Sequence, residues 1–327
     1  MPRTLLVCCA FVLAFFDRGL GSKPLDVQLD MRNVQLHLDE GIVLGINRLR
    51  GVMVSRSAGA PPVFDDSNSY VLRLQTATMS MDMASLQSLM NRYVFAYEGS
   101  PLKDLTVQVE GGRLKMKGKL RKGVDVPFST TASVSTTPDG RLRLHAESLK
   151  ALGVPAKGLL EIFGLKLDDV MDIKKRRGVE VQDNDIIIAS GQILPPPEIV
   201  GRLAKVSVSG NTLLQVFDDA SNGRPSKLVL PSPSSPNYVY FGGGDIRFGK
   251  LTMHDADLQL IDSDPKDPFD FFPAKYSAQL VAGYSKNTPA KGLKTYMPDY
   301  GDLRSLPAKA GSHKEGGVLP AKTGKHN

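Results

Sequence analysis

Six aspartates between positions 255 and 270 form the most metal-like group in the chain, and calcium is bound in proteins by several carboxylates from one loop. The apolar Leu258 and Leu260 alternate within the group, as in a strand that leads into a polar turn. The spacing does not match an EF-hand loop. We therefore expect a strand and a turn, with a calcium site at Asp255, Asp257 and Asp262 as the alternative. The six residues are Asp255, Asp257, Asp262, Asp264, Asp267 and Asp270.

Three histidines and one glycine-rich segment are the other residues with chemical potential. His37, His145 and His254 are scattered over strand-like segments without zinc-site spacing. The segment Gly244–Leu251 (GDIRFGKL) is close to a P-loop, but Leu251 replaces the Ser or Thr that would hold magnesium. Neither a Gly-x-Ser-x-Gly elbow nor a His-Glu-x-x-His motif occurs. We therefore expect no enzymatic activity, no cofactor and no bound metal.

The positive charge of the chain lies at its ends. The net charge is +7 and the pI is about 9.2. Residues 1–24 carry three basic side chains against one acidic, and residues 285–327 carry eight against three. Residues 25–284 are neutral, with 30 basic and 30 acidic side chains. The overall pI therefore gives no support for a nucleic-acid partner.

The N-terminus has the features of a secretory signal. Arg3 precedes the apolar run Leu5–Phe16, which is shorter than the ~20 residues that a transmembrane helix needs. Gly19 and Gly21 are suited to cleavage before Ser22, which predicts a signal peptide over 1–21. An uncleaved anchor or a soluble start is the alternative. Both cysteines lie within this segment, so we expect an exported, cysteine-free protein of the periplasm or cell envelope.

Alternating apolar residues predict strands over most of the chain, first over 25–54 and 70–81. In the segment 105–149, Gly111-Gly112 and Asp139-Gly140 mark hairpin turns of an antiparallel meander. Lys122-Gly123 is the only weak break between these turns, which allows one long strand there. Further strands are expected over 179–188, with a turn at Asp183-Asn184, and over 206–217. The segments 239–248 and 251–261 predict a last strand pair.

Two segments change to helical spacing. Apolar residues from Met83 to Tyr97 follow i, i+3, i+4, i+7 spacing, with Ser80 or Asp82 as the N-cap and Gly99 near the end. Residues 155–171 predict one long or two short helices that begin near Pro155. The basic run 174–177 would complement the helix dipole, or alternatively contact anionic lipid headgroups. The fold class expected is therefore α+β, with a long, strongly curved antiparallel sheet wrapped around two amphipathic helices.

The central segments resemble the LmeA-type proteins of the bacterial cell envelope over about residues 25–217. The similarity lies in a mid-strand glycine, a strand before a turn, a basic strand after it, a helix that opens near a proline, and a hairpin. The corresponding residues are Gly118, Val126-Pro127-Phe128, Gly140-Arg141-Leu142, Pro155 and Asp183-Asn184. The resemblance implies a tubular lipid-binding fold and a role in phospholipid or glycolipid handling.

Four regions follow from this interpretation. A signal peptide (1–21) precedes a lipid-binding-like domain (22–217), a β extension packed on that domain (218–284) and a disordered basic tail (285–327).

The expected function is non-enzymatic lipid binding or transfer, with acyl chains in an apolar groove between helices and sheet and a possible peripheral membrane contact. The alternative is a structural or interaction protein with a filled core and a basic tethering tail. The residues expected to bind the acyl chains are Leu86, Leu89, Met90, Tyr93, Val94, Met116, Val126, Phe128, Leu160 and Phe163.

Overall fold

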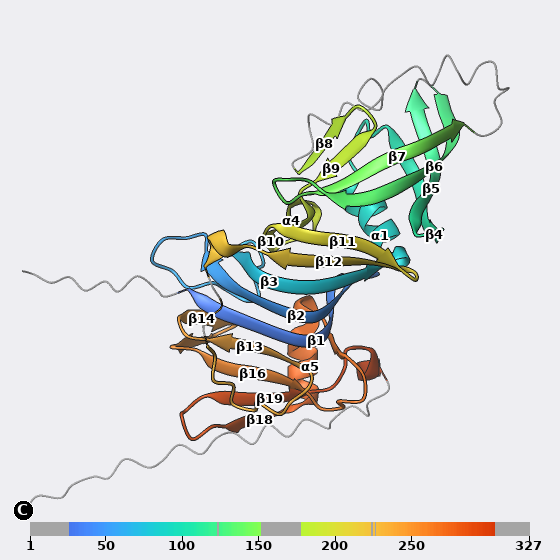
Figure 1. Cartoon of the computed structure of the whole chain (residues 1–327). Helices are drawn as coiled ribbons and strands as arrows, with labels where there is room; N and C mark the ends of the chain where they lie inside the picture. Colours follow the sequence, from blue (N-terminus) through green and yellow to red (C-terminus); the bar gives the residue numbers. More distant parts are fainter. Residues whose placement is uncertain (1–25, 123, 152–177, 224, 226, 305–327) are drawn as a thin grey trace, which may run out of the picture.

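The structure is a computed structural model that describes residues 26–122, 124–151, 178–223, 225 and 227–304 (Figure 1). The expected signal peptide, the expected helix over 155–171 and the basic run 174–177 lie outside these residues. Of the described residues, 55% lie in strands and 13% in helical segments. Among them, no helix is both long and apolar enough to span a bilayer.

The larger of two main sheets has eleven strands and joins both ends of the described chain. Its strands are β1 (Val27–Asp39), β2 (Ile42–Ser55), β3 (Tyr70–Asp82), β10 (Glu198–Val200), β11 (Leu203–Ser209), β12 (Thr212–Asp218), β13 (Tyr238–Gly242), β16 (Asp257–Asp262), β17 (Phe269–Phe271), β18 (Tyr284–Asn287) and β19 (Leu293–Met297). The order is β11-β12-β3-β2-β1-β13-β16-β19-β18, with β10 beside β3 and β17 beside β1.

The long strands β1, β2 and β3 form where the sequence alternates. Leu29, Leu44 and Leu74 are buried on the inner face, and the positions between them point to the opposite, outer face. Gly41 has a φ of 72° in the turn between β1 and β2, which fixes the register at Leu36 opposite Leu44. The expected strands over 25–54 and 70–81 are confirmed.

The smaller sheet has six strands and contains the expected meander. Its strands are β4 (Leu102–Glu110), β5 (Arg113–Lys122), β6 (Val124–Thr136), β7 (Leu142–Ala151), β8 (Val179–Gln182) and β9 (Asp185–Ile188), in the order β4-β5-β6-β7-β9-β8. Gly111 and Gly112 have the expected positive φ, and Asp183, also with positive φ, lies in the predicted turn between β8 and β9. A single long strand from Leu114 to Thr136 is wrong, because Lys122 pairs with Val124 in an antiparallel hairpin.

The helical segments are short. They are α1 (Met83–Leu89), the π-helix η1 (Met90–Val94), α4 (Ser190–Ile193), α5 (Tyr276–Ala282) and the 3-10 segments η2 (Ala220–Asn222), η3 (Pro273–Lys275) and η4 (Gly301–Arg304).

The predicted α+β fold with a strongly curved sheet around two amphipathic helices is therefore wrong. The structure is mostly β, and its large sheets are not strongly curled. Alternation identifies which face of a strand is buried but does not identify what covers that face. Here a single hydrophobic core includes buried side chains of both main sheets, such as Leu44 and Leu114.

The C-terminal segments also differ from expectation. Each strand of the expected last pair is divided into two shorter strands. Strand β13 pairs with β16, and β14 (Asp245–Phe248) pairs with β15 (Leu251–His254). Residues 285–304, expected to be disordered, contain most of β18, all of β19 and η4. Strand β19 runs parallel to β16 and buries Thr295 and Met297. This pairing and burial explain why the segment forms regular structure.

Candidate functional site

Helix α1 positions most of the residues expected to contact a lipid. Asp82 is the N-cap and accepts a hydrogen bond from the Ser85 N–H at 2.7 Å. The helical spacing buries Met83, Leu86 and Leu89 on one side. The helix then widens into the π-helix η1 and ends at Val94, three residues before the expected end. Helix formation is therefore confirmed over most of the predicted segment.

The same helix connects the two sheets. It contacts β2 and β3 of the larger sheet and β4 at the edge of the smaller one (Figure 1). Asn91 Nδ2 donates to the Leu105 carbonyl at 2.7 Å, and its Oδ1 accepts from the Leu105 N–H at 2.9 Å. Gln87 Oε1 accepts from the Val107 N–H at 3.2 Å. These side chains form hydrogen bonds with backbone groups of Leu105 and Val107 on the edge strand β4. Those groups would otherwise be available to another strand.

The predicted lipid-binding residues fall into three groups according to where they lie. Six are buried in the common core: Leu86, Leu89, Met90, Val94, Met116 and Phe128. Tyr93 and Val126 are half-buried. Leu160 and Phe163 lie outside the described residues. The structure therefore brings six of the ten into one core, and two of the six, Leu86 and Leu89, line a small cavity.

The polar end of Tyr93 forms a hydrogen bond with a charged residue. Its hydroxyl donates to Asp39 Oδ2 at 2.5 Å, and this hydrogen bond, together with burial, raises the pKa of Tyr93. The same bond is the main cause of the lowered pKa of Asp39, which the Arg92 guanidinium also favours. The Tyr93 hydroxyl thus connects the end of η1 to the end of β1, and its ring packs against the hydrophobic core.

One small apolar cavity lies where the sheets meet, and we call its lining the inter-sheet seam. Its volume is about 30 Å³. Ser190 belongs to this lining, and its hydroxyl is buried without a hydrogen-bond partner among the described residues. The lining comprises Leu44, Met79, Met81, Leu86, Leu89, Leu142, Ser190, Gly191, Ile193, Leu194, Ile199, Leu213, Gln215 and Phe217.

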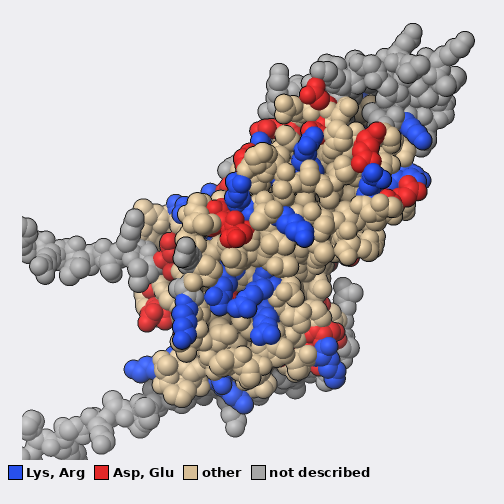
Figure 2. Space-filling view, in the orientation of Figure 1, with Lys and Arg blue, Asp and Glu red and all other residues tan. Residues whose placement is uncertain are grey.

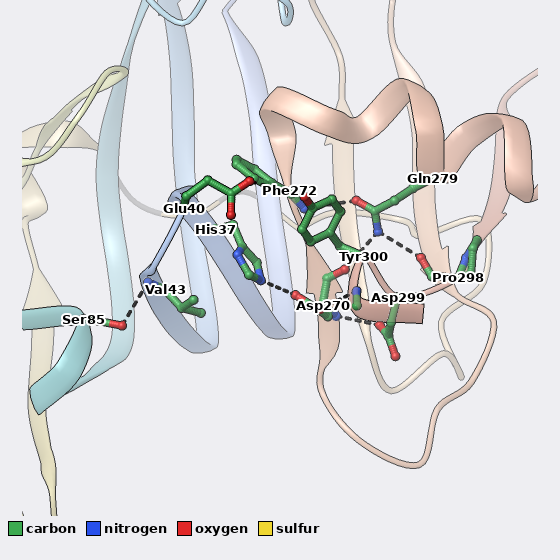
Figure 3. Close-up of polar contacts among 11 residues, drawn as sticks. His37, Glu40, Val43, Ser85, Asp270, Phe272, Gln279, Pro298, Asp299 and Tyr300 are labelled. Atoms are coloured by element: carbon green, nitrogen blue, oxygen red, sulfur yellow. Dashed lines mark hydrogen bonds and ion pairs between the residues drawn. The ribbon is translucent and has the colours of Figure 1, made fainter. Parts of the chain in front are cut away.

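The three scattered histidines each meet an aspartate. His37 Nε2 lies 2.5 Å from Asp270 Oδ1 (Figure 3), His145 Nδ1 lies 2.6 Å from Asp185 Oδ1, and the exposed His254 lies beside Asp245. None of these three pairs was predicted from the sequence. His37 and Asp270 are separated by 233 positions, and no local pattern encodes such a pairing.

The His37–Asp270 pair is held by its surroundings. The His37 ring stacks on Phe272 at 5.2 Å between centroids and meets Tyr300 edge-on (Figure 3). Burial raises the pKa of Asp270, but hydrogen bonds from His37 and the Gly301 N–H outweigh burial and lower it. The other ring nitrogen, Nδ1, is buried and has no partner within the described part of the chain. Through its Nε2 atom, His37 links β1 to β17, on which Asp270 lies.

Of the three aspartates expected for calcium, Asp262 belongs to a carboxylate cluster in the described chain, but Asp255 and Asp257 do not. Asp257 and Asp262 lie at opposite ends of β16, and Asp257 accepts from the Tyr240 hydroxyl at 3.2 Å. Carboxylate oxygens of Asp262, Asp267 and Asp299 instead lie within 4.8 Å of one another. Three carboxylates supply the right chemistry for a hard cation but only part of the six to eight oxygens that calcium takes.

Repulsion among these carboxylates can be relieved by a bound proton as well as by a bound cation. Burial raises the pKa of Asp262 despite a hydrogen bond from Asn237. Burial, assisted by the neighbouring Asp262, Asp267 and Asp270, raises the pKa of Asp299 to about 7. Near neutral pH the cluster can therefore hold a proton in place of a cation.

The fold and the seam define a mostly β protein with two sheets that share one apolar core. Comparison of the chain with family models, with curated proteins and with solved structures gives no significant match. The LmeA-type resemblance therefore stays a prediction, and the proposals below depend on the geometry of the chain itself.

Proposed function

We propose that the protein binds the acyl chain of a lipid in the inter-sheet seam, without an enzymatic step. The composition of the seam is the observation that carries this proposal. Strands of both main sheets and the helices α1 and α4 contribute to it, and every side chain in the lining is apolar except those of Ser190 and Gln215. Burial of an acyl chain in such surroundings contributes about 0.8 kcal/mol per CH₂.

The seam has to widen to admit a chain, because a cavity of about 30 Å³ has room for no more than about two or three water molecules. Met79 and Met81 are suited to this change, since methionine is unbranched and has three rotatable bonds. Helix α4 has four residues, so its displacement would break few backbone hydrogen bonds. We propose that a lipid enters by displacing these side chains.

Ser190 supplies a polar end for the bound chain. Its buried hydroxyl has no partner among the described residues, and an unsatisfied buried hydroxyl costs about 1–3 kcal/mol. An ester or amide carbonyl of a phospholipid or glycolipid would accept this hydrogen bond and remove the cost. With the expected export signal, the place of action would be the periplasm or cell envelope.

Two measurements on the full chain test the proposal. Mass spectrometry of organic extracts from native-source protein should reveal a stoichiometric lipid, and the purified protein should take up an acyl-labelled lipid from vesicles. Leu213→Trp fills the seam and should abolish uptake. Leu260→Trp is the matched control, because Leu260 is equally buried on β16 and is absent from the seam lining.

Both substitutions overpack the core, with an expected cost of about 1–3 kcal/mol. Equal thermal destabilisation with loss of uptake in Leu213→Trp alone would support the seam. Absence of both extracted lipid and uptake in the unmodified chain would contradict the proposal.

The small cavity favours a second candidate, a structural or interaction protein of the envelope with a filled core. Side chains of α1 and of the meander belong to one cluster of buried residues, which is what this candidate requires. It predicts no lipid in the extract, and it predicts that Leu213→Trp and Leu260→Trp behave alike.

A further inference from the structure

The outer face of the larger sheet carries a concentration of positive charge. Arg32 on β1, Arg48 and Arg50 on β2 and Arg73 on β3 project from this face, and we call these four residues the basic face. Figure 2 shows Lys and Arg side chains gathered over the strands that Figure 1 labels β1 and β2. Arg32, Arg48 and Arg73 are exposed, and Arg50 is half-buried.

The charges on this face are poorly neutralised. Arg32 lies directly opposite Arg48 in the antiparallel register, and like charges in that position are destabilising. The nearby carboxylate of Asp30 is buried and accepts from Arg50 Nε at 2.7 Å and from the Tyr238 hydroxyl at 3.1 Å. Within the described chain, Arg32, Arg48 and Arg73 form no ion pair.

Apolar side chains share the face with these arginines. Val200 on β10 pairs with Arg73 and is 38% exposed, and Leu214 on β12 pairs with Ser80 and is 36% exposed. The inter-sheet seam and the cavities beside Arg56 and beside Arg141 are lined by other residues. The face is therefore an open sheet surface with separated cations and a few apolar side chains. That combination complements a plane of anionic headgroups over an apolar layer better than a fully polar polyanion.

We propose that the basic face docks the protein on the surface of a membrane that contains anionic phospholipids. The arginines would contact headgroup phosphates, to which a guanidinium can donate two parallel hydrogen bonds. Val200 and Leu214 would enter the headgroup region. The docking does not require a lipid in the inter-sheet seam, so the two proposals can fail separately.

Vesicle co-sedimentation of the full chain tests the docking. The vesicles contain phosphatidylcholine alone or phosphatidylcholine with phosphatidylglycerol. The double variant Arg32→Gln, Arg48→Gln is compared with the control Lys117→Gln, Arg121→Gln, which removes the same charge from exposed positions on β5. The first variant also removes a like-charge contact, so it should melt at or above the wild-type temperature.

The wild type and the control should bind the phosphatidylglycerol vesicles and should bind less at high salt. The variant at Arg32 and Arg48 should lose roughly 30-fold in partition coefficient, from about 1 kcal/mol per basic residue near an anionic membrane. Equal binding by the two variants would overturn the proposal. The proposal would also be overturned if the wild type bound the two kinds of vesicle equally. Preferential binding to heparin, a soluble polyanion, over the vesicles would overturn it as well.

Discussion

At the residue scale, Asp299 makes the stability of the fold dependent on pH. Burial and three neighbouring aspartates raise its pKa to about 7 from the ordinary value of 3.8, although the Asp270 N–H donates to it at 2.7 Å. The folded protein therefore keeps a proton that the unfolded chain releases. The stabilising contribution is complete below about pH 4 and is lost as the pH rises towards 7.

Asp299→Asn should remove this loss, because an amide stays neutral and can still accept the hydrogen bond from the Asp270 N–H. The free energy of unfolding should change little near pH 4 and should rise near pH 8. The rise should be only about 1 kcal/mol, because solvent access screens part of the effect. Urea unfolding at both pH values measures the difference. Asp255→Asn, at an exposed turn position, is the control. A gain that is independent of pH would contradict the assignment.

Gln279 is a second residue whose side chain controls stability. It is fully buried on α5, and its amide makes three hydrogen bonds (Figure 3). Its Oε1 accepts from the Phe272 N–H at 3.0 Å, and its Nε2 donates to the Asp270 and Pro298 carbonyls, each at 2.9 Å. The side chain thereby connects α5, β17 and the segment after β19.

Gln279→Leu should destabilise the protein by about 2–4 kcal/mol, because three buried backbone groups lose their partner. Thermal unfolding followed by circular dichroism measures the change. Gln108→Leu, at an exposed position on β4, is the matched control and should change the stability by less than about 0.5 kcal/mol. Similar effects of the two substitutions would show that the hydrogen bonds of Gln279 contribute little.

At the element scale, local patterns predicted individual strands and turns but not their partners. The alternation in β1 to β7 and the positive φ of Gly111 and Gly112 are properties of a few neighbouring residues, so they could be inferred from the sequence. Strand β1 pairs with β13, about two hundred positions away, and that choice depends on the whole fold. Strand β19 was missed because its three alternating core residues lie in a Gly- and Lys-rich segment.

The parallel pairing of β19 with β16 predicts the effect of truncation. Removal of residues 284–327 should expose the edge of β16 and uncover Ile261, and should destabilise the protein or prevent folding. Removal of residues 305–327 alone is the control and should preserve the thermal transition. Limited proteolysis and circular dichroism would compare the two chains. Equal stability of the two truncated chains would contradict a structural role for β18 and β19.

Local sequence patterns also predicted only part of the candidate site. The helical spacing of Leu86 and Leu89 placed both residues correctly on the buried face of α1. Sequence could not show that α4 and β12 complete the inter-sheet seam, because Ser190 and Leu213 lie more than a hundred positions from α1 along the chain. The basic face was hidden as well, since overall charge balance over 25–284 conceals an uneven distribution.

At the scale of the whole molecule, the shared core couples the two sheets. Buried residues from both sheets belong to one hydrophobic cluster, and α1 contacts both of them. Neither sheet can expose its inner face without exposing apolar surface of the other. The same coupling means that a lipid bound in the seam would stabilise both sheets together, by an amount set by its concentration relative to Kd.

Unfolding should therefore occur in one cooperative transition. Leu74→Ala on β3 and Leu114→Ala on β5 each truncate a fully buried side chain, one in each sheet, and each should cost about 2–5 kcal/mol. Far-ultraviolet circular dichroism and the fluorescence of the nine tyrosines, in a chain without tryptophan, should report the same midpoint for each variant. Two separate transitions, with each variant shifting only one, would show that the sheets fold independently. In that case a ligand in the seam could not stabilise both.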